Sequence, residues 1–320
     1  MLKFFRFLNE IGKPPWNYYF LQNLDESEYP KYLAEIFKYR TGENLPLHFS
    51  FIKNTMKINK KRCETFNQKI QWLKLYDNTP LKRELTDKIK AREYLKEKTG
   101  EEYFKPILQI CNSFDETDFS KLPDSFVMKT NHGCKWQYII KNKKEFLNTP
   151  KLFEIVKRQM TGWLEQDYSF WCGFEMNYRG IEPKIIIEPL MREYINKDQT
   201  KINIYFFNGI PKIIIKFFDN KMSIWDEKFD SMDNIFNFSE ENIKMNTDDL
   251  INQTFDLSIK TEKFLNFELV RTDWMIYKNK PYFEELTFSP YSGFINFKDK
   301  NINKRLGSWL NLERLNYEFG

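Results

Sequence analysis

Three segments decide the fold of this chain: Phe126-Val-Met-Lys-Thr-Asn-His-Gly133, Ile185-Ile-Ile-Glu-Pro-Leu-Met191, and Val270-Arg-Thr-Asp273 followed by Tyr282-Phe-Glu-Glu-Leu-Thr-Phe-Ser-Pro290. The first is an apolar strand with Lys129 at its end, before a loop that contains Gly133. The second is a β-branched run that ends in Glu188, and the third predicts a hairpin with acids on one face. A lysine can bind phosphates, a strand end followed by a linker can contact a purine, and paired acids can bind magnesium. Together these features indicate an ATP site.

The hairpin follows from strand geometry. Side chains alternate faces along a strand, so Arg271 shares a face with Asp273, and Glu285 shares one with Thr287. A three-residue turn, Lys278-Asn-Lys280, places Asp273 directly opposite Glu285. Facing carboxylates repel each other, and a magnesium ion removes that repulsion. Two solvated surface acids are the alternative, which the apolar residues on either side of the pair disfavour.

These segments resemble the TupA-like branch of the ATP-grasp enzymes, from about Arg40 to about Gly307. The resemblance also rests on Phe66–Asp77, Asp87–Arg92, Phe207–Gly209 and Leu286–Gly293. It implies an α+β ATP-grasp fold in which two α+β subdomains clamp ATP. The expected parts are an N-terminal, mostly helical region over 1–100, a small nucleotide-covering subdomain over 101–184, and a large subdomain with the metal site over 185–320.

The resemblance also implies a role for particular residues. ATP binding is implied for Lys88, Lys129, His132, Gly133, Glu188, Pro189, Leu190 and Met191. Magnesium binding is implied for Asp273, Glu285 and Thr287, and catalytic roles for Arg271 and Lys129.

Three positions depart from the family pattern. Lys135 stands where the family tends to carry the second glycine of the phosphate loop. Lys201-Ile-Asn203 stands where relatives tend to carry Asp-Tyr-Lys, and Thr287 stands where many have asparagine. Glycine allows a loop to approach phosphate closely, whereas lysine loses that freedom and adds charge.

The implied reaction is carboxylate activation by ATP with magnesium, followed by attack of an amine on an acylphosphate. The implied substrates are a carboxylated sugar, such as a uronic acid of a capsular or other surface polysaccharide or its precursor, and an amino acid or small amine. One alternative is a glycosyltransferase of polysaccharide biosynthesis, although the chain has no Asp-x-Asp motif. The other alternative is a non-catalytic nucleotide-binding protein.

Composition narrows the partners and the compartment. The chain of 320 residues has 50 basic and 45 acidic side chains, a net charge of +5, so we expect no nucleic-acid partner. The spacing of Cys63, Cys111, Cys134 and Cys172 suggests neither zinc nor disulfides and fits a reducing, cytoplasmic compartment. Cys134 beside His132 is a possible nucleophile and base, but no oxyanion pattern accompanies the pair.

No segment reads as a signal peptide or a membrane span. Met1–Leu8 is apolar but interrupted by charge, so it is either an amphipathic lead-in helix or a contact with the inner face of the membrane that is at most peripheral. The sequence leaves the oligomeric state open.

The periodicity predicts the following elements. Helices are expected over Thr65–Leu95, with a cap at Thr86-Asp87 for Lys88–Lys98, near Leu152–Trp163, and over Leu250–Phe264. Strands of the small subdomain are expected at Ile107–Cys111, Ser125–Lys129 and Gln137–Ile140. A larger antiparallel sheet is expected from Ile185–Glu188, Ile202–Phe207, Lys212–Phe217, Glu268–Tyr277 and Pro281–Thr287. A second site near the cleft, or simple packing, is expected for Lys69, Trp72, Lys74, Asp77, Arg92 and Trp136.

Overall fold

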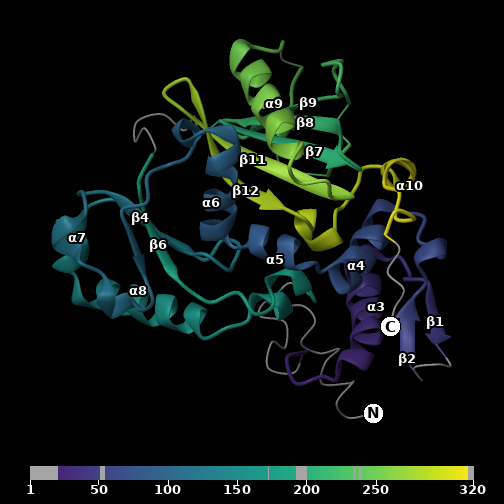
Figure 1. The fold of residues 1–320 in the computed structure, drawn as a ribbon, viewed down its shortest axis with the longest axis horizontal. Helices are drawn as coiled ribbons and strands as arrows, with labels where there is room; N and C mark the ends of the chain where they lie inside the picture. Colours follow the sequence, from purple (N-terminus) through teal and green to yellow (C-terminus); the bar gives the residue numbers. More distant parts are fainter. Residues whose placement is uncertain are drawn as a thin grey trace.

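The computed structural model describes residues 21–50, 55–171, 173–191, 200–233, 235–237, 240–244 and 246–315, and Figure 1 shows their fold. The expected membrane contact at Met1–Leu8 lies outside these residues. Strands form three sheets, with the orders β1-β2, β3-β6-β4-β5 and β10-β9-β8-β7-β11-β12. Helices and sheets are both present in quantity, as an α+β fold requires.

The elements have the following bounds. The helices are α3 (Tyr29–Thr41), α4 (Phe66–Tyr76), α5 (Pro80–Thr86), α6 (Lys88–Thr99), α7 (Lys143–Leu147), α8 (Pro150–Leu164), α9 (Asp249–Glu262) and α10 (Lys300–Trp309). The strands are β1 (Leu47–Ser50), β2 (Thr55–Ile58), β3 (Gln109–Cys111), β4 (Phe126–Thr130), β5 (Gln137–Ile140), β6 (Ile185–Pro189), β7 (Lys201–Phe207), β8 (Ile210–Phe218), β9 (Lys221–Trp225), β10 (Glu241–Asn242), β11 (Leu269–Tyr277) and β12 (Lys280–Thr287). Short 3₁₀ turns include Tyr168–Phe170, Met176–Tyr178 and Pro290–Gly293.

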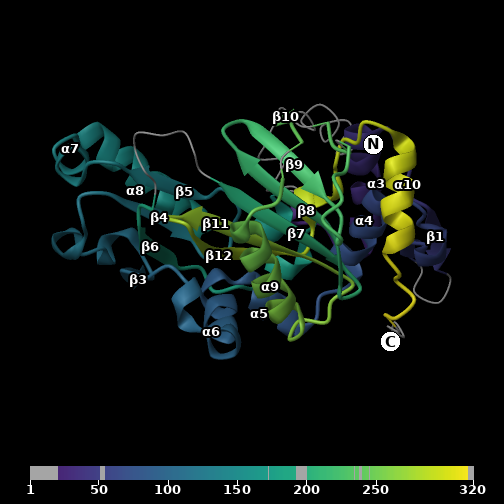
Figure 2. The ribbon, with the colours of Figure 1, turned by 90° about the horizontal axis from the view of Figure 1, so that it is seen from above.

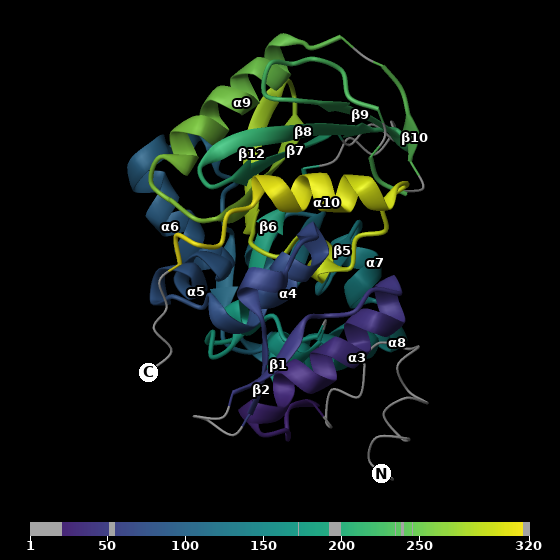
Figure 3. The same cartoon turned by 90° about the vertical axis from the view of Figure 1, so that its right-hand side faces the viewer.

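The six-stranded sheet is covered on both faces. Alternation along β7 sends Ile202, Ile204 and Phe206 into one apolar cluster, with residues of α5, α6 and α9. It sends Tyr205 and Phe207 into another cluster, with residues of α3, α4 and α10. Figure 3 shows α9 on one side of this sheet and α10, α4 and α3 on the other.

The four-stranded sheet forms its own layer with α7 and α8, at the left of Figures 1 and 2. Phe126 and Met128 of β4 pack in one cluster with Val156 and Met160 of α8. Lys129 lies between the inward-facing positions of β4, so alternation turns it to the opposite face. That face meets the six-stranded sheet across a cleft.

Two expectations about the elements are wrong. Strand β6 pairs with β3 and β4, so it belongs to the four-stranded sheet and not to the larger one. Its three isoleucines are fully buried, and an apolar run of this kind does not specify which strands lie beside it. In the helical stretch expected over Thr65–Leu95, the predicted cap at Asp87 begins α6, but an unpredicted break at Thr79 with Pro80 also begins α5.

The hairpin of β11 and β12 places Asp273 opposite Glu285, as predicted, although its turn differs from the expected one. The turn has two residues, Lys278 and Asn279, both with positive φ (49° and 56°). On its own this shorter turn would shift the register by one residue. A β-bulge at Glu284 restores it, because Trp274 pairs with Phe283 whereas Asp273 pairs with Glu285.

Two further expectations from the sequence are that no segment spans a membrane and that the cysteines form no disulfide bonds. Within the described part of the chain, no helix is both long enough and apolar enough to cross a bilayer. Cys63, Cys111 and Cys134 are free thiols, as expected, and Cys172 lies outside the described residues.

The contact of α10 with the start of α4 depends on Gly307. A Cβ atom there would overlap the carbonyl oxygen of Glu64. We expect Gly307→Ala to lower the free energy of unfolding by about 1–3 kcal/mol, since backbone atoms would have to move apart. Gly162 in α8 has no atom within 4 Å of its Cβ position, so Gly162→Ala is the matched control. It should raise stability by up to about 1 kcal/mol. Urea unfolding measures the stability of both variants. Equal changes in Gly307→Ala and Gly162→Ala would contradict the close approach of α10 to the start of α4.

Candidate functional site

A cavity of about 560 Å³ lies between the two larger sheets. It is lined by Lys88 of α6, Lys129 of β4 and the loop after β4, and across from them by Asn203, Asp273 and Glu285. The face of β4 that carries Lys129 therefore meets the face of β11 that carries Asp273. Residues far apart in the chain form one polar cleft.

One wall of the cleft is built around Glu188. Its carboxylate pairs with Lys129 (Nζ to Oε2, 2.8 Å), with Arg92 (Nη1 to Oε1, 2.7 Å) and more distantly with Lys105 (Nζ to Oε2, 3.9 Å). Burial opposes ionisation of Glu188, but these cations hold its pKa at about 2. Burial also lowers the pKa of Lys129, against the attraction of Glu188.

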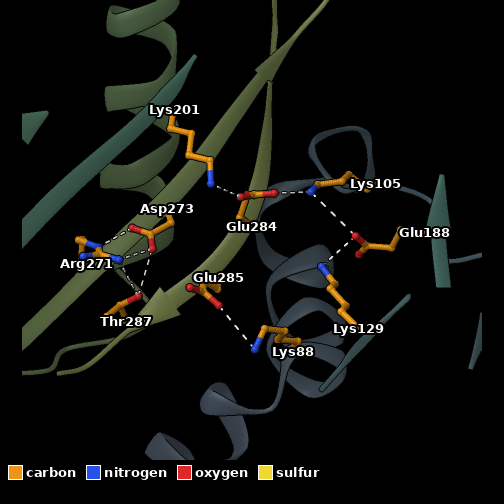
Figure 4. Close-up of polar contacts among 10 residues, drawn as sticks. All are labelled: Lys88, Lys105, Lys129, Glu188, Lys201, Arg271, Asp273, Glu284, Glu285 and Thr287. Atoms are coloured by element: carbon orange, nitrogen blue, oxygen red, sulfur yellow. Dashed lines mark hydrogen bonds and ion pairs between the residues drawn. The ribbon is translucent and has the colours of Figure 1, made fainter. Parts of the chain in front are cut away.

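The bulge residue Glu284 links this wall to the other sheet (Figure 4). Its carboxylate accepts a hydrogen bond from Lys105 and lies 3.7 Å from Nζ of Lys201. Burial would raise the pKa of Glu284, but Lys105, Lys201 and Lys129 hold it at about 2. A chain of alternating charges thus runs from Lys201 through Glu284 and Lys105 to Glu188.

The segment expected to contact adenine lies next to this chain of charges. Glu188, Pro189, Leu190 and Met191 line a pocket whose opposite wall includes Met275 of β11. Apolar side chains of β5, β11 and this segment share the pocket with charged ones, and a flat heterocycle needs such a combination of apolar contact and polar groups.

The acids expected to bind magnesium lie on β11 and β12. Arg271 holds Asp273 through two hydrogen bonds of 2.6 Å, from Nε and Nη2, and the hydroxyl of Thr287 donates to Asp273 at 3.1 Å. Glu285, opposite Asp273, lies 3.6 Å from Nζ of Lys88. Burial alone would lower the pKa of Arg271, but the Asp273 carboxylate raises it, so the guanidinium stays charged.

This donor set fits magnesium, since it offers only carboxylate and hydroxyl oxygens. No cluster of three or more His, Cys, Asp or Glu side chains suited to a metal occurs among the described residues. A magnesium ion between Asp273 and Glu285 would therefore take its remaining ligands from phosphate and water.

The loop after β4 contains Lys135, one of the three positions that depart from the family pattern. Lys88 donates to the carbonyl oxygen of Gly133 at 2.6 Å, and a Cβ atom at Gly133 would overlap the ring of Trp136. Lys135 has a φ of 62°, the left-handed conformation that the family's glycine would adopt without strain. The side-chain amine of Lys135 thereby lies at the edge of the cleft, and the backbone strain at this residue costs of order 1 kcal/mol.

His132 does not join the other expected site residues. Its Nδ1 lies 3.2 Å from Oδ1 of Asn131, and its Nε2 lies 3.1 Å from the carbonyl oxygen of Trp163. The ring is therefore held inside the protein between two oxygen atoms, and burial lowers its pKa. The thiol of Cys134 has its pKa raised by burial to about 11, so the pair lacks a thiolate for nucleophilic attack.

A second cavity of about 590 Å³ adjoins the first. Arg271, Glu285 and Thr287 form part of its wall, and much of the rest is aromatic, including Trp136, Trp171 and Tyr291. The indole N–H of Trp136 is buried and has no hydrogen-bond partner within the described structure. A ligand in this cavity would reach the acids of the first cavity directly.

Packing explains several residues of the expected second site. Lys69 donates to the carbonyl oxygens of Gly307 and Leu310, both at 2.7 Å, and Trp72 is buried. Asp77 pairs with Lys82 at 2.5 Å beneath the surface. Of the remaining three, Arg92 contacts Glu188, Trp136 lines both cavities, and Lys74 donates to Ser292 beside the second cavity.

Sequence reasoning missed four residues that the structure places in the two cavities or the charged wall between them. They are Lys105, Lys201, Glu284 and Glu175. Lys201 was noticed only as a departure from a family pattern. Glu284 should face away from Glu285 by alternation, and only the bulge turns it into the cleft. Neither Lys105 nor Glu175 carries a local signal, since each lies in an irregular segment between elements.

Comparison with known proteins confirms the resemblance. The model of the TupA-like ATPgrasp family matches residues 68–311. No curated protein is similar enough in sequence to count as a relative.

Three solved structures are similar at low TM-scores. A D-alanine–D-alanine ligase from Bacillus anthracis complexed with ATP is 16% identical (TM-score 0.40), with 72% of this chain and 64% of that chain covered. A D-alanine–D-alanine ligase from Helicobacter pylori is 16% identical (0.40), with 90% and 86% covered. An L-amino acid ligase from Bacillus licheniformis is 12% identical (0.41), with 69% and 47% covered. The chain thus spans less than two thirds of the length of both Bacillus proteins, and at these scores the likeness carries no argument about activity.

The charges around Glu188 predict a pH dependence of stability. Its folded pKa of about 2 lies below the ordinary value of 4.5. The ionised carboxylate therefore stabilises the fold above about pH 4.5, and this contribution is lost as the pH falls towards 2. We expect Glu188→Gln to cost about 3–5 kcal/mol at pH 7, because it leaves buried cations unpaired. The variant should also show a shallower loss of stability between pH 4.5 and 2.

Urea unfolding across this pH range measures both effects. The exposed Glu182 provides the control variant Glu182→Gln, which should behave as wild type. Identical pH slopes in Glu188→Gln and wild type would show that Glu188 does not stabilise the fold through its charge.

Proposed function

The chain belongs to the TupA-like ATPgrasp family, and from that premise we propose that it is an ATP-dependent ligase. It would join a carboxylate to an amine through an acylphosphate. The observation that carries the proposal is the meeting of Lys88, Lys129, Asp273, Glu285 and Arg271 around one cavity. Two lysines on one side and two acids on the other suit a magnesium-bound polyphosphate.

Each of these residues would have a distinct task. Lys129 and Lys88 would bind phosphate oxygens and offset their charge as the γ-phosphoryl group moves to the substrate carboxylate. Magnesium, held by Asp273 and Glu285 with Thr287 beside them, would neutralise charge on the transferred phosphoryl group. The amine then attacks the acyl carbon, and the C–O bond to phosphate breaks. Arg271 would stabilise the oxyanion that forms at this carbon.

The substrates we propose are a carboxylated sugar and an amino acid or small amine. The sugar would be a uronic acid of a capsular or other surface polysaccharide, or its precursor. The aromatic cavity supports this choice, because flat rings such as Trp171 and Tyr291 offer broad apolar surfaces. Arg271 at its edge suits the carboxylate. The compartment that accompanies this proposal is the cytoplasm, where ATP and free thiols coexist.

A non-catalytic nucleotide-binding protein is the second candidate. One observation favours it, namely that Arg271 occupies both oxygens of Asp273. Oδ2 also accepts from Thr287, so the lone pair left for magnesium is the second one of Oδ1. The measurements below distinguish the two candidates, because binding without turnover would support the second.

Magnesium-dependent ATP binding should depend on Glu285. We expect Glu285→Ala to weaken ATP binding in the presence of magnesium by tenfold or more, about 1.4 kcal/mol, since a carboxylate ligand is lost. Binding without magnesium should change little. Isothermal titration with ATP, with magnesium and with EDTA, measures both, and Glu182→Ala is an exposed control. If ATP binding by Glu285→Ala depended on magnesium as in the wild type, Glu285 would not be a magnesium ligand.

The reaction predicts an amide product. Uronic acids such as glucuronate and galacturonate are screened with ATP against a panel of amines, and products are read by mass spectrometry. We expect ADP release that requires both substrates, and a hydroxamate when hydroxylamine replaces the amine. Arg271→Ala should lower turnover by about 10²–10³-fold, as loss of an oxyanion donor does, with ATP binding largely kept. Phosphate on a sugar hydroxyl, without amide or hydroxamate, would instead identify a kinase.

A further inference from the structure

Glu175 is a buried carboxylate for which the proposed function has no role yet. It lies at the start of the turn Met176–Tyr178 and lines the aromatic cavity. Its side chain accepts a hydrogen bond of 2.6 Å from the hydroxyl of Ser289. Ser289 lies two residues after Thr287, so the chain segment that carries the metal-site hydroxyl also holds Glu175.

The proposed reaction needs a proton acceptor in this cavity. An amine arrives at neutral pH as an ammonium ion, which has no lone pair for attack on an acyl carbon. A side chain that removes this proton must reach the cavity with a carboxylate or a ring nitrogen. A buried carboxylate beside aromatic faces also attracts a cation before any proton moves.

The other side chains near the cavity are poorer bases than a carboxylate, and its tyrosines carry a phenol proton at neutral pH. His132 does not line this cavity, and its ring nitrogens face oxygens of Asn131 and Trp163. Cys134 is a protonated thiol with a pKa of about 11, and Lys135, Arg40 and Arg271 are cationic. Of the two carboxylates that line the cavity, Glu285 lies beside Lys88 at the metal site. Glu175 is the carboxylate that remains.

We infer that Glu175 binds the ammonium group of the amine substrate and accepts a proton from it. This inference rests on the proposed ligase function. Once the proton has moved to Glu175, the lone pair of nitrogen forms the C–N bond while the C–O bond to phosphate breaks. The second nitrogen proton leaves with the phosphate, and Glu175 returns its proton to water. The site therefore takes a primary amine that is cationic in solution, and Glu175 is a catalytic residue.

The surroundings of Glu175 suit this role. Burial raises its pKa, although the charge of Lys74 and the hydroxyls of Ser289 and Ser292 oppose that rise. A carboxylate with a raised pKa is a better match for an ammonium ion than an ordinary one.

The test compares two nucleophiles in Glu175→Gln. The substrate pair is the uronic acid and amine that give the highest wild-type turnover in the screen above, and the second arm replaces the amine with hydroxylamine. Hydroxylamine is mostly unprotonated at neutral pH and needs no base. We expect amide formation to fall by about 10²-fold or more, while hydroxamate formation stays near wild type. The exposed Glu182→Gln should leave both arms unchanged.

Each other outcome has a defined meaning. Amide formation at the wild-type rate, or an equal loss in both arms by a folded variant, would overturn the role of Glu175. Absence of hydroxamate in the wild type would refute the ligase function itself, and the inference with it. Thermal denaturation shows whether Glu175→Gln folds. If it does not, Ser289→Ala replaces it, and a loss confined to the amide arm is again expected.

Discussion

The β-bulge at Glu284 is the constraint on which the rest of the cleft depends. One extra residue in β12 lets two successive acids face the same space, which regular alternation forbids. Glu284 then meets Lys105 and Lys201, while Glu285 faces Asp273 and lies near Lys88. Without the bulge, one of the two acids would point away from the cleft, and either the link between the sheets or the pair of metal-site acids would be lost.

The chain of charges that starts at this bulge positions the lysine side chains more than it stabilises the fold. Taking several ions out of water is costly, and a buried pair often stabilises a fold no better than apolar residues would. Here the ions join two sheets whose buried apolar residues belong to separate clusters. Glu188 fixes Lys129 at the edge of the first cavity, and Glu284 fixes Lys105 in the neighbouring pocket, so both cations are held in place before a ligand binds. Such preorganisation is what electrostatic catalysis requires.

The two cavities divide the proposed chemistry between them. The first contains the lysines, and the second contains aromatic rings and Glu175. Arg271 and Glu285 belong to both, so the substrate carboxylate that receives the phosphoryl group and is then attacked by the amine would lie where the cavities meet. Arg271 also holds Asp273 through two hydrogen bonds, so it lies between the metal-site acid and the second cavity.

The sequence by itself determined the family, the α+β class, the strands that carry Lys129 and Asp273, and the pairing of Asp273 with Glu285. These features follow from local periodicity and from short motifs, which depend on neighbours in the chain. Only the tertiary structure decided that β6 joins the smaller sheet, that Glu284 turns into the cleft, and that Glu175 reaches the aromatic cavity. The pairing of an all-apolar strand, a one-residue bulge and the direction of a loop side chain are each set by packing against distant segments, and no local pattern records them.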